Sequence, residues 1–270
     1  MKRKIGIDKT GIKEEDKEIA VDILGKLRNG ERVFGNPGEG LKKTLKNIDE
    51  KIQKSKSSDP LEWTIVDKDL IKEKNLAKAG LSGEQQLAEY IEKIVKNDPE
   101  LHGITFFASL SENYQDHLEE SGYIPDTDFI AVYGNNIMIL DAKNIRVQED
   151  SPLYIIENKL MSLNTVLMEL SPSNYFWENL FLKEGLDVKT DGCVVIISQS
   201  KALIFKNQEW YISPCKPVYI GDLRQFLLDW INKIEDNKIS LRLLVFLSKM
   251  QIKKNEQKIS YGRTIDRFKR

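Results

Sequence analysis

Cysteine and histidine, the residues that most often build zinc and redox sites, are scarce in this chain. The 270 residues include 2 Cys and 2 His. Cys193 and Cys215 form no CxxC pattern, so neither a disulfide framework nor a cysteine zinc site is expected. With only His102 and His117, a multi-histidine metal site is excluded and a serine-histidine triad is not expected. Catalysis by this chain would depend on carboxylates and lysines.

Long hydrophobic runs are also missing. No stretch approaches the roughly 20 apolar residues that a membrane-spanning helix needs. The N-terminal sequence MKRKIGIDKTG is basic but continues into Lys, Glu and Asp, where a secretory signal would need an apolar segment. Together with the scarcity of cysteine, these features predict a cytoplasmic protein that does not bind membranes.

Neither sign of charge dominates the chain. The formal net charge is −1, which argues against a polycationic coat for nucleic acid. Basic residues are nevertheless concentrated between residues 253 and 270. The hydrophobic content of 40% is enough to bury at least one sizeable core.

Three regions are predicted along the chain. Residues 1–75 are rich in Lys and Glu and contain two predicted helices, 13–28 and 40–56, separated by turn-forming residues. Residues 76–236 carry the strongest helix and strand patterns and are predicted to form the main domain. Residues 237–270 are predicted to be a basic C-terminal extension.

The main domain opens with a helix signal. Ser82, followed three residues later by Gln85, matches a capping box that would begin a helix with one apolar face. The elements predicted after it are strands 103–110, 128–133 and 137–143, a helix from Ser171 to Gly185, a buried strand 193–198, a small hairpin within 202–212 and a helix 222–235. The core order is therefore helix, three strands, helix, strand.

The second and third strands are predicted to form a hairpin that brings charged residues together. Gly134 and Asn135 tolerate the backbone of a tight turn, and a turn there places Asp128 opposite Asp141. Because side chains alternate along a strand, Lys143 projects to the same face as Asp141. Two facing carboxylates beside apolar strands repel each other, and a divalent cation would reverse that cost. Mg²⁺ or Mn²⁺, which prefer oxygen ligands, suit such a site.

Glu84 joins this group by a separate argument. It precedes Leu87 and Ala88 by three and four residues, so it lies over the helix face that should pack on the sheet. A carboxylate at the start of a helix is also favoured by the helix dipole. Two interpretations therefore remain for Glu84, a metal ligand and an ordinary helix-start residue.

These residues follow a known arrangement, in which a helical Glu precedes a carboxylate that opens one strand, a turn, and an apolar strand that ends in Asp/Glu-x-Lys. The chain resembles the PD-(D/E)xK nuclease superfamily. The segments GLSGEQQLAEYI and TDFIAVYGNNIMILDAKN are similar to the nuclease-related domain (NERD) family, over roughly residues 78–235. The resemblance implies an α/β fold with a restriction-endonuclease-like αβββαβ core and a central mixed sheet, here with an N-terminal helical extension.

The resemblance also implies roles for individual residues. The implied catalytic residues are Glu84, Asp128, Asp141 and Lys143, the implied metal ligands are Glu84, Asp128, Asp141 and Ala142, and Asn144 is an implied helper. Asp141 stands where glutamate is more usual in the family, which shortens the side chain by one methylene. Because a literal Pro125-Asp126 pair precedes Asp128, Asp126 is an alternative ligand, although Asp128 directly adjoins the apolar strand.

The activity implied is hydrolysis of phosphodiester bonds with Mg²⁺ or Mn²⁺ as cofactor, on DNA in preference to RNA. The alternative is a catalytically silent module that binds nucleic acid or protein on the same fold. The N-terminal helices are a candidate surface for homo-oligomerisation or for a regulatory protein partner.

Overall fold

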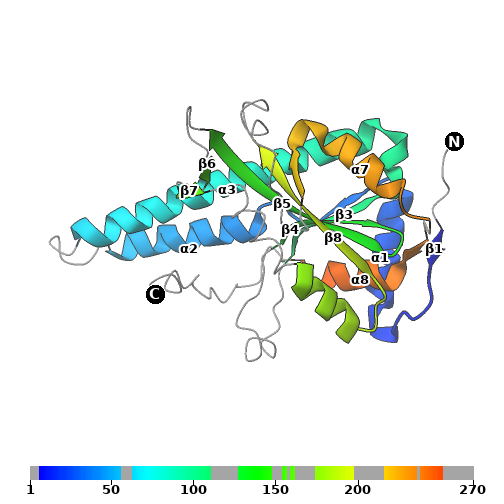
Figure 1. Cartoon of the computed structure of the whole chain (residues 1–270). Helices are drawn as coiled ribbons and strands as arrows, with labels where there is room; N and C mark the ends of the chain where they lie inside the picture. Colours follow the sequence, from blue (N-terminus) through cyan, green and yellow to red (C-terminus); the bar gives the residue numbers. More distant parts are fainter. Residues whose placement is uncertain are drawn as a thin grey trace.

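The structure is a computed structural model, and it describes residues 6–55, 63–110, 127–147, 154–156, 159–161, 174–197, 216–235 and 238–251. The fold is mixed α/β and is built around a central mixed sheet (Figure 1). The predicted fold class is confirmed at this level.

The central sheet has the strand order β2-β3-β4-β5-β8-β9. Its strands are β2 (Val33–Phe34), β3 (Thr105–Leu110), β4 (Thr127–Tyr133), β5 (Asn136–Val147), β8 (Lys189–Ile197) and β9 (Lys216–Tyr219). The pairs β3-β4 and β4-β5 are antiparallel, whereas β2-β3, β5-β8 and β8-β9 are parallel. The far end of β5 continues into an antiparallel ribbon with β6 (Tyr154–Ile156) and β7 (Lys159–Met161).

Helices cover both faces of the sheet. The α-helices are α1 (Lys17–Arg28), α2 (Glu39–Ser55), α3 (Trp63–Asn97), a helix over 174–183, α7 (Leu223–Ile231) and α8 (Leu241–Lys249), and the short 3₁₀ helices are η1 (Glu14–Asp16), η2 (Pro99–Gly103) and η4 (Ile220–Asp222). Buried residues of α3 and α7 pack on one face, and those of α1, α8 and the helix 174–183 pack on the other. Strands buried on both faces read as continuous apolar runs, which is why 129–133 of β4 and 193–197 of β8 show little alternation in sequence.

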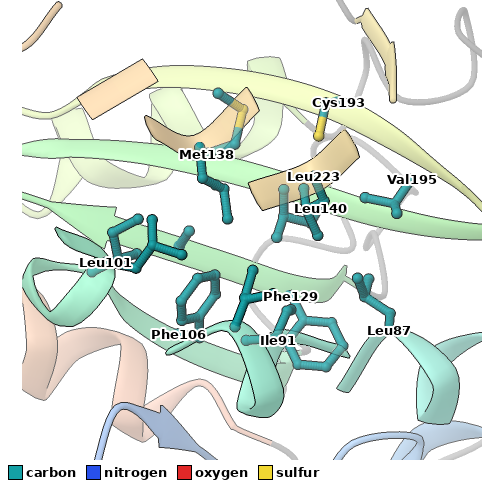
Figure 2. Close-up of a cluster of buried hydrophobic side chains, with 14 of the residues drawn as sticks. Leu87, Ile91, Leu101, Phe106, Phe129, Met138, Leu140, Cys193, Val195 and Leu223 are labelled. Carbon is teal, nitrogen blue, oxygen red and sulfur yellow. The ribbon is translucent and has the colours of Figure 1, made fainter. Parts of the chain in front are cut away.

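The sheet has a hydrophobic core on each face, and successive side chains along a strand belong alternately to one core and to the other. Phe129 and Leu140 belong to the core beneath α3 and α7, together with Leu87 and Ile91 of α3 and Leu223 of α7 (Figure 2). The intervening β4 and β5 residues belong to the core beneath α1 and α8. This alternation assigns every strand residue near the hairpin to one of two faces.

The capping box predicted at Ser82 is wrong, because α3 runs without interruption from Trp63 to Asn97. Within the helix, Nε2 of Gln86 donates hydrogen bonds to the carbonyl oxygen and to Oγ of Ser82, at 3.2 and 3.1 Å. Glu84 therefore lies in the middle of a helix, and the helix-dipole explanation for its position does not apply. The same helix crosses the boundary predicted between residues 75 and 76.

The segments predicted as extensions contribute to the same core as the main domain. Ile23 of α1 and Leu244 of α8 are buried in one cluster, and Phe34 of β2 stacks on Phe107 with ring centroids 5.3 Å apart. The short strands β1 (Ile7–Asp8) and β10 (Ile239–Ser240) pair in parallel as a separate two-stranded sheet. The N-terminal region is therefore more than a helical extension, since β2 forms an edge of the central sheet.

Some predictions fall on residues that are not described. These are the alternative ligand Asp126, the hairpin within 202–212 and the basic residues from 253 to 270. Across the described ranges, no helix has both the length and the apolar character needed to cross a bilayer.

Candidate functional site

The β4-β5 hairpin positions the candidate residues, and its predicted turn is confirmed. Tyr133 pairs with Asn136, which leaves Gly134 and Asn135 as the two loop residues. Gly134 has a φ of +59° and Asn135 does not have a positive φ, the pattern of a type II′ turn. The pairing of β4 with β5 extends to Phe129 opposite Leu140, and the same register carried one step further places Asp128 opposite Asp141.

Asp128 is held by the strand opposite to it. Its Oδ2 accepts a hydrogen bond from the main-chain nitrogen of Ala142 at 2.7 Å. Burial raises the pKa of Asp128 well above its ordinary value, and the negative charges of Glu84 and then Asp141 raise it further. The Lys143 ammonium and the Ala142 N–H lower this pKa, but they do not outweigh the other effects. The protein alone therefore disfavours the carboxylate form of Asp128.

Asp141 and Lys143 form an ion pair on one face of β5. The Nζ of Lys143 lies 3.0 Å from Oδ2 and 3.3 Å from Oδ1 of Asp141. Both side chains are only 18% exposed, so solvent screens this pair less than it screens a surface ion pair. Residues two apart in a strand share a face, and this geometry agrees with the predicted alternation.

Glu84 reaches this group from α3. Its side chain is buried, with 8% of the residue exposed. Gly83 lies against β5, because a Cβ atom at Gly83 would make an ordinary van der Waals contact of 3.6 Å with Cβ of Asn144. Since α3 packs on the face that carries Leu140, strand alternation places Glu84 on the face opposite to Asp141. Its electrostatic effect on Asp128 shows that the two carboxylates are nevertheless neighbours.

The cluster thus combines three carboxylates with one ammonium group. Among the residues that the structure describes, no three His, Cys, Asp or Glu side chains are arranged to hold a metal ion. Glu84, Asp128 and Asp141 are therefore electrostatic neighbours and not a preformed ligand set. Their chemistry still fits Mg²⁺ or Mn²⁺, because carboxylate oxygens are the ligands that these ions prefer and the negative charge exceeds the positive.

Ala142 and Asn144, the two other residues predicted at the site, differ in what they can contribute to it. Ala142 has a main-chain carbonyl as its only candidate ligand atom, since its methyl group carries no donor and its N–H is bonded to Asp128. Asn144 lies on the opposite face from Lys143, against Gly83 of α3. The position of Asn144 is explained by packing, and its role as a helper stays a prediction.

Ser109 of β3 is a neighbour of the cluster that the sequence did not indicate. It has a φ of +51°, in the left-handed region that residues other than glycine rarely adopt. The residues on either side of Ser109 pair with the residues on either side of Asp128, so the two face each other across β3 and β4. Strained backbone of this kind is often found at functional sites.

The Ser109 hydroxyl attaches the start of α2 to this strand. Its Oγ donates a hydrogen bond to the carbonyl oxygen of Asn36 at 2.8 Å and accepts one from the main-chain nitrogen of Glu39 at 3.2 Å. Between them, Gly38 has a φ of +73°, and a Cβ atom there would lie 3.8 Å from Oε2 of Glu84. The loop before α2 is therefore part of the wall around the cluster. No sequence pattern encodes this, because the partners are about 70 residues apart.

We expect Ser109→Ala to lower the free energy of unfolding by about 1–2 kcal/mol, because two hydrogen bonds of the hydroxyl are lost while the backbone stays strained, although the Glu39 N–H keeps its own bond to the Asn36 carbonyl. Ser109→Gly should lose less, because glycine adopts a positive φ without strain. Urea denaturation measures both, with the exposed Ser82→Ala as a matched serine control. A stability of Ser109→Ala equal to that of Ser82→Ala would contradict this role of the hydroxyl.

No family model, curated protein or solved structure matches the chain. The resemblance to NERD nucleases thus remains a prediction from the motif residues.

Proposed function

We propose that the protein is a metal-dependent nuclease of the PD-(D/E)xK type, related to the NERD family, that hydrolyses phosphodiester bonds and favours DNA. One observation carries the proposal. The hairpin register brings Asp128 opposite Asp141 and its ion-paired Lys143, with the buried Glu84 as an electrostatic neighbour. Clusters of carboxylates with shifted pKa values are typical of functional sites.

The order of elements supports the same proposal. Helix α3 is followed by β3, β4 and β5, then by the helix 174–183 and by β8, which lies parallel to β5. This is the αβββαβ succession expected of a restriction-endonuclease-like core. The candidate residues lie on the middle strands β4 and β5 and on α3, which is compatible with such a core.

The chemistry follows from the charges of the cluster. Glu84, Asp128 and Asp141 would hold the cation, and the repulsion that Glu84 and Asp141 exert on the Asp128 carboxylate is the reason to expect one. When bound, Mg²⁺ or Mn²⁺ would act as a Lewis acid on the phosphate and activate a water molecule. The hydrogen bond from Ala142 already orients the Asp128 carboxyl group.

Lys143 has a role of its own in the proposed reaction. The oxygen of a water molecule forms a bond to phosphorus while the bond from phosphorus to the leaving sugar oxygen breaks, one water proton passes overall to that leaving oxygen, and negative charge grows on the phosphoryl oxygens in the transition state. The Lys143 ammonium group, kept in place by Asp141, can donate a hydrogen bond to these oxygens. A donor that is already oriented stabilises the transition state more than one that must reorganise.

The test is cleavage of DNA by the purified full chain with EDTA, Mg²⁺, Mn²⁺ or Ca²⁺, and with RNA as a parallel substrate. We expect cutting with Mg²⁺ or Mn²⁺ only, and its loss in Asp141→Ala. Cleavage that persists in EDTA, or that Asp141→Ala retains, would contradict the proposal.

The absence of a preformed ligand arrangement among the described residues favours a second candidate, a silent binding module. A thermal melt separates the two. For a nuclease, Mn²⁺ should raise the melting temperature, and Asp141→Ala should remove that rise. A melt that does not respond to Mn²⁺, together with no cleavage, would favour the binding module.

A further inference from the structure

Helices α2 and α3 form an arm that begins at the carboxylate cluster. In Figure 1 the two helices run side by side away from the sheet. At the root, a Cβ atom at Gly38 would lie 3.8 Å from Oε2 of Glu84, and next to it a Cβ atom at Gly80 would touch Leu41 at 3.0 Å. The 17 residues of α2 extend over about 25 Å at 1.5 Å per residue. The arm therefore leads directly away from the proposed active centre.

One flank of this arm carries lysines from both helices. Lys42 and Lys46 are four residues apart in α2, and Lys74 and Lys78 are four residues apart in α3, so each pair shares a face of its helix. Asp49, three residues after Lys46, forms an ion pair with Lys74 and joins the two faces. We call these residues the lysine flank. Glu50, four residues after Lys46, shares the same face, so the flank carries four ammonium groups and two carboxylates.

An apolar seam joins the two helices beside the ion pair between Asp49 and Lys74. Ile48 and Ala77 are buried between the helices, where they supply the apolar seam. Lys42, Lys46 and Lys78 are exposed. Nine lysines and six acidic residues lie in 39–55 and 63–82, a net charge of +3, whereas the whole chain has a net charge of −1. Positive charge is thus concentrated on the arm beside an acidic cluster.

We propose that the lysine flank binds the sugar-phosphate backbone of DNA and guides it to the carboxylate cluster. The proposal rests on the nuclease function proposed above. A cluster of carboxylates repels a polyanion, so a nearby positive surface is needed to bring the substrate close. Lysines act as point charges on phosphates and give affinity without sequence preference. A length of about 25 Å corresponds to about seven nucleotide steps of 3.4 Å.

The test compares two double variants of the full chain with the same change in charge. Lys46→Glu/Lys78→Glu alters the lysine flank at two exposed positions. Lys68→Glu/Lys72→Glu is the matched control, because these exposed lysines are also four residues apart on α3 but lie roughly 80° to 160° around the helix from Lys74 and Lys78, toward the far end of the arm. Fluorescence anisotropy with a labelled 20-base-pair duplex in Ca²⁺, at several KCl concentrations, measures affinity without cleavage.

We expect Lys46→Glu/Lys78→Glu to weaken binding between about tenfold and about 60-fold at 0.1 M KCl, because two lost phosphate contacts cost about 1.8 logarithmic units there. The slope of log affinity against log salt concentration should become shallower by about 1.8, the value for two phosphate contacts. The control pair should bind within about twofold of the unchanged protein. Equal weakening by both pairs, or none by Lys46→Glu/Lys78→Glu, would overturn the proposal.

Other outcomes separate this proposal from the nuclease assignment. Metal-dependent cleavage with unchanged affinity in Lys46→Glu/Lys78→Glu would retain the nuclease and overturn the role of the flank. Selective loss of binding, without any cleavage by the unchanged protein, would support the flank and contradict the nuclease. A dimer in light scattering that only Lys46→Glu/Lys78→Glu dissociates would make the flank an interface between copies. If that variant does not fold, the pair Lys46→Gln/Lys78→Gln replaces it.

Discussion

Lys143→Met is expected to lower the rate of metal-dependent DNA cleavage by at least about two orders of magnitude, the loss that follows removal of one oriented charge-stabilising group. In the unchanged protein, the ammonium group of Lys143 lies 3.0 Å from Oδ2 of Asp141. Its positive charge also lowers the pKa of Asp128. Methionine keeps most of the length and the apolar stem but donates no hydrogen bond. Single-turnover cleavage of a labelled duplex, with enzyme in excess over DNA, measures the chemical step.

Lys189→Met is the matched control for this variant. Lys189 is an exposed lysine at the start of β8, where it pairs with Asn136 at the hairpin end of β5, away from Asp141. We expect its cleavage rate to stay within about twofold of that of the unchanged protein. Thermal melts in EDTA and in Mn²⁺ show that each variant folds. A folded Lys143→Met protein that cuts as fast as the Lys189→Met control would refute the catalytic role of Lys143.

Asp128→Asn is expected to stabilise the protein in EDTA at pH 8 by about 1–3 kcal/mol, the range of large single-substitution effects. Burial and the charges of Glu84 and Asp141 raise the pKa of Asp128 in the folded state above its value in the unfolded chain. The folded protein therefore binds this proton more tightly, and stability is lost as the pH rises from about 4 through the raised pKa. Asparagine never ionises, and its amide oxygen can still accept the hydrogen bond from Ala142.

The difference between Asp128→Asn and the unchanged protein should disappear below about pH 4, where the aspartate is neutral in both states. Urea denaturation in EDTA, in steps from pH 4 to pH 8, measures this window. Asp69→Asn, the same substitution at an exposed position on α3, is the matched control. Adding Mn²⁺ should reverse the order, since the carboxylate gains a cation and asparagine does not. A difference that stays constant across this pH range would contradict the role given to burial and repulsion.

The hairpin could be predicted because its determinants are local. Gly134 and Asn135 define the turn, and alternation along two short strands then sets which residues face each other. Lys143 and Asp141 are neighbours for the same reason, since residues two apart in a strand share a face. These relations do not depend on anything outside residues 127–147.

The helix before the hairpin was predicted in part. Its apolar period located Leu87 and Ile91 on the face that packs on the sheet. The start of the helix was wrongly predicted at Ser82. A serine can bond to a nearby glutamine inside a helix as well as at its start, as Ser82 and Gln86 do here. Local sequence therefore identified the buried face, whereas the preceding chain determined where the helix begins.

The amino-acid sequence by itself determined the four inner strands of the central sheet, the hairpin register and the charged residues that the hairpin brings together. Only the tertiary structure decided what surrounds them. It brought Glu84, from the helix on the other face of the sheet, close enough to repel the charge of Asp128, held Ser109 in a left-handed conformation against the start of α2, and joined the lysine-bearing faces of α2 and α3 through an ion pair. The reason is physical: register follows from neighbours along the chain, whereas burial, charge repulsion and backbone strain depend on segments that are far apart in sequence and meet only when the chain folds.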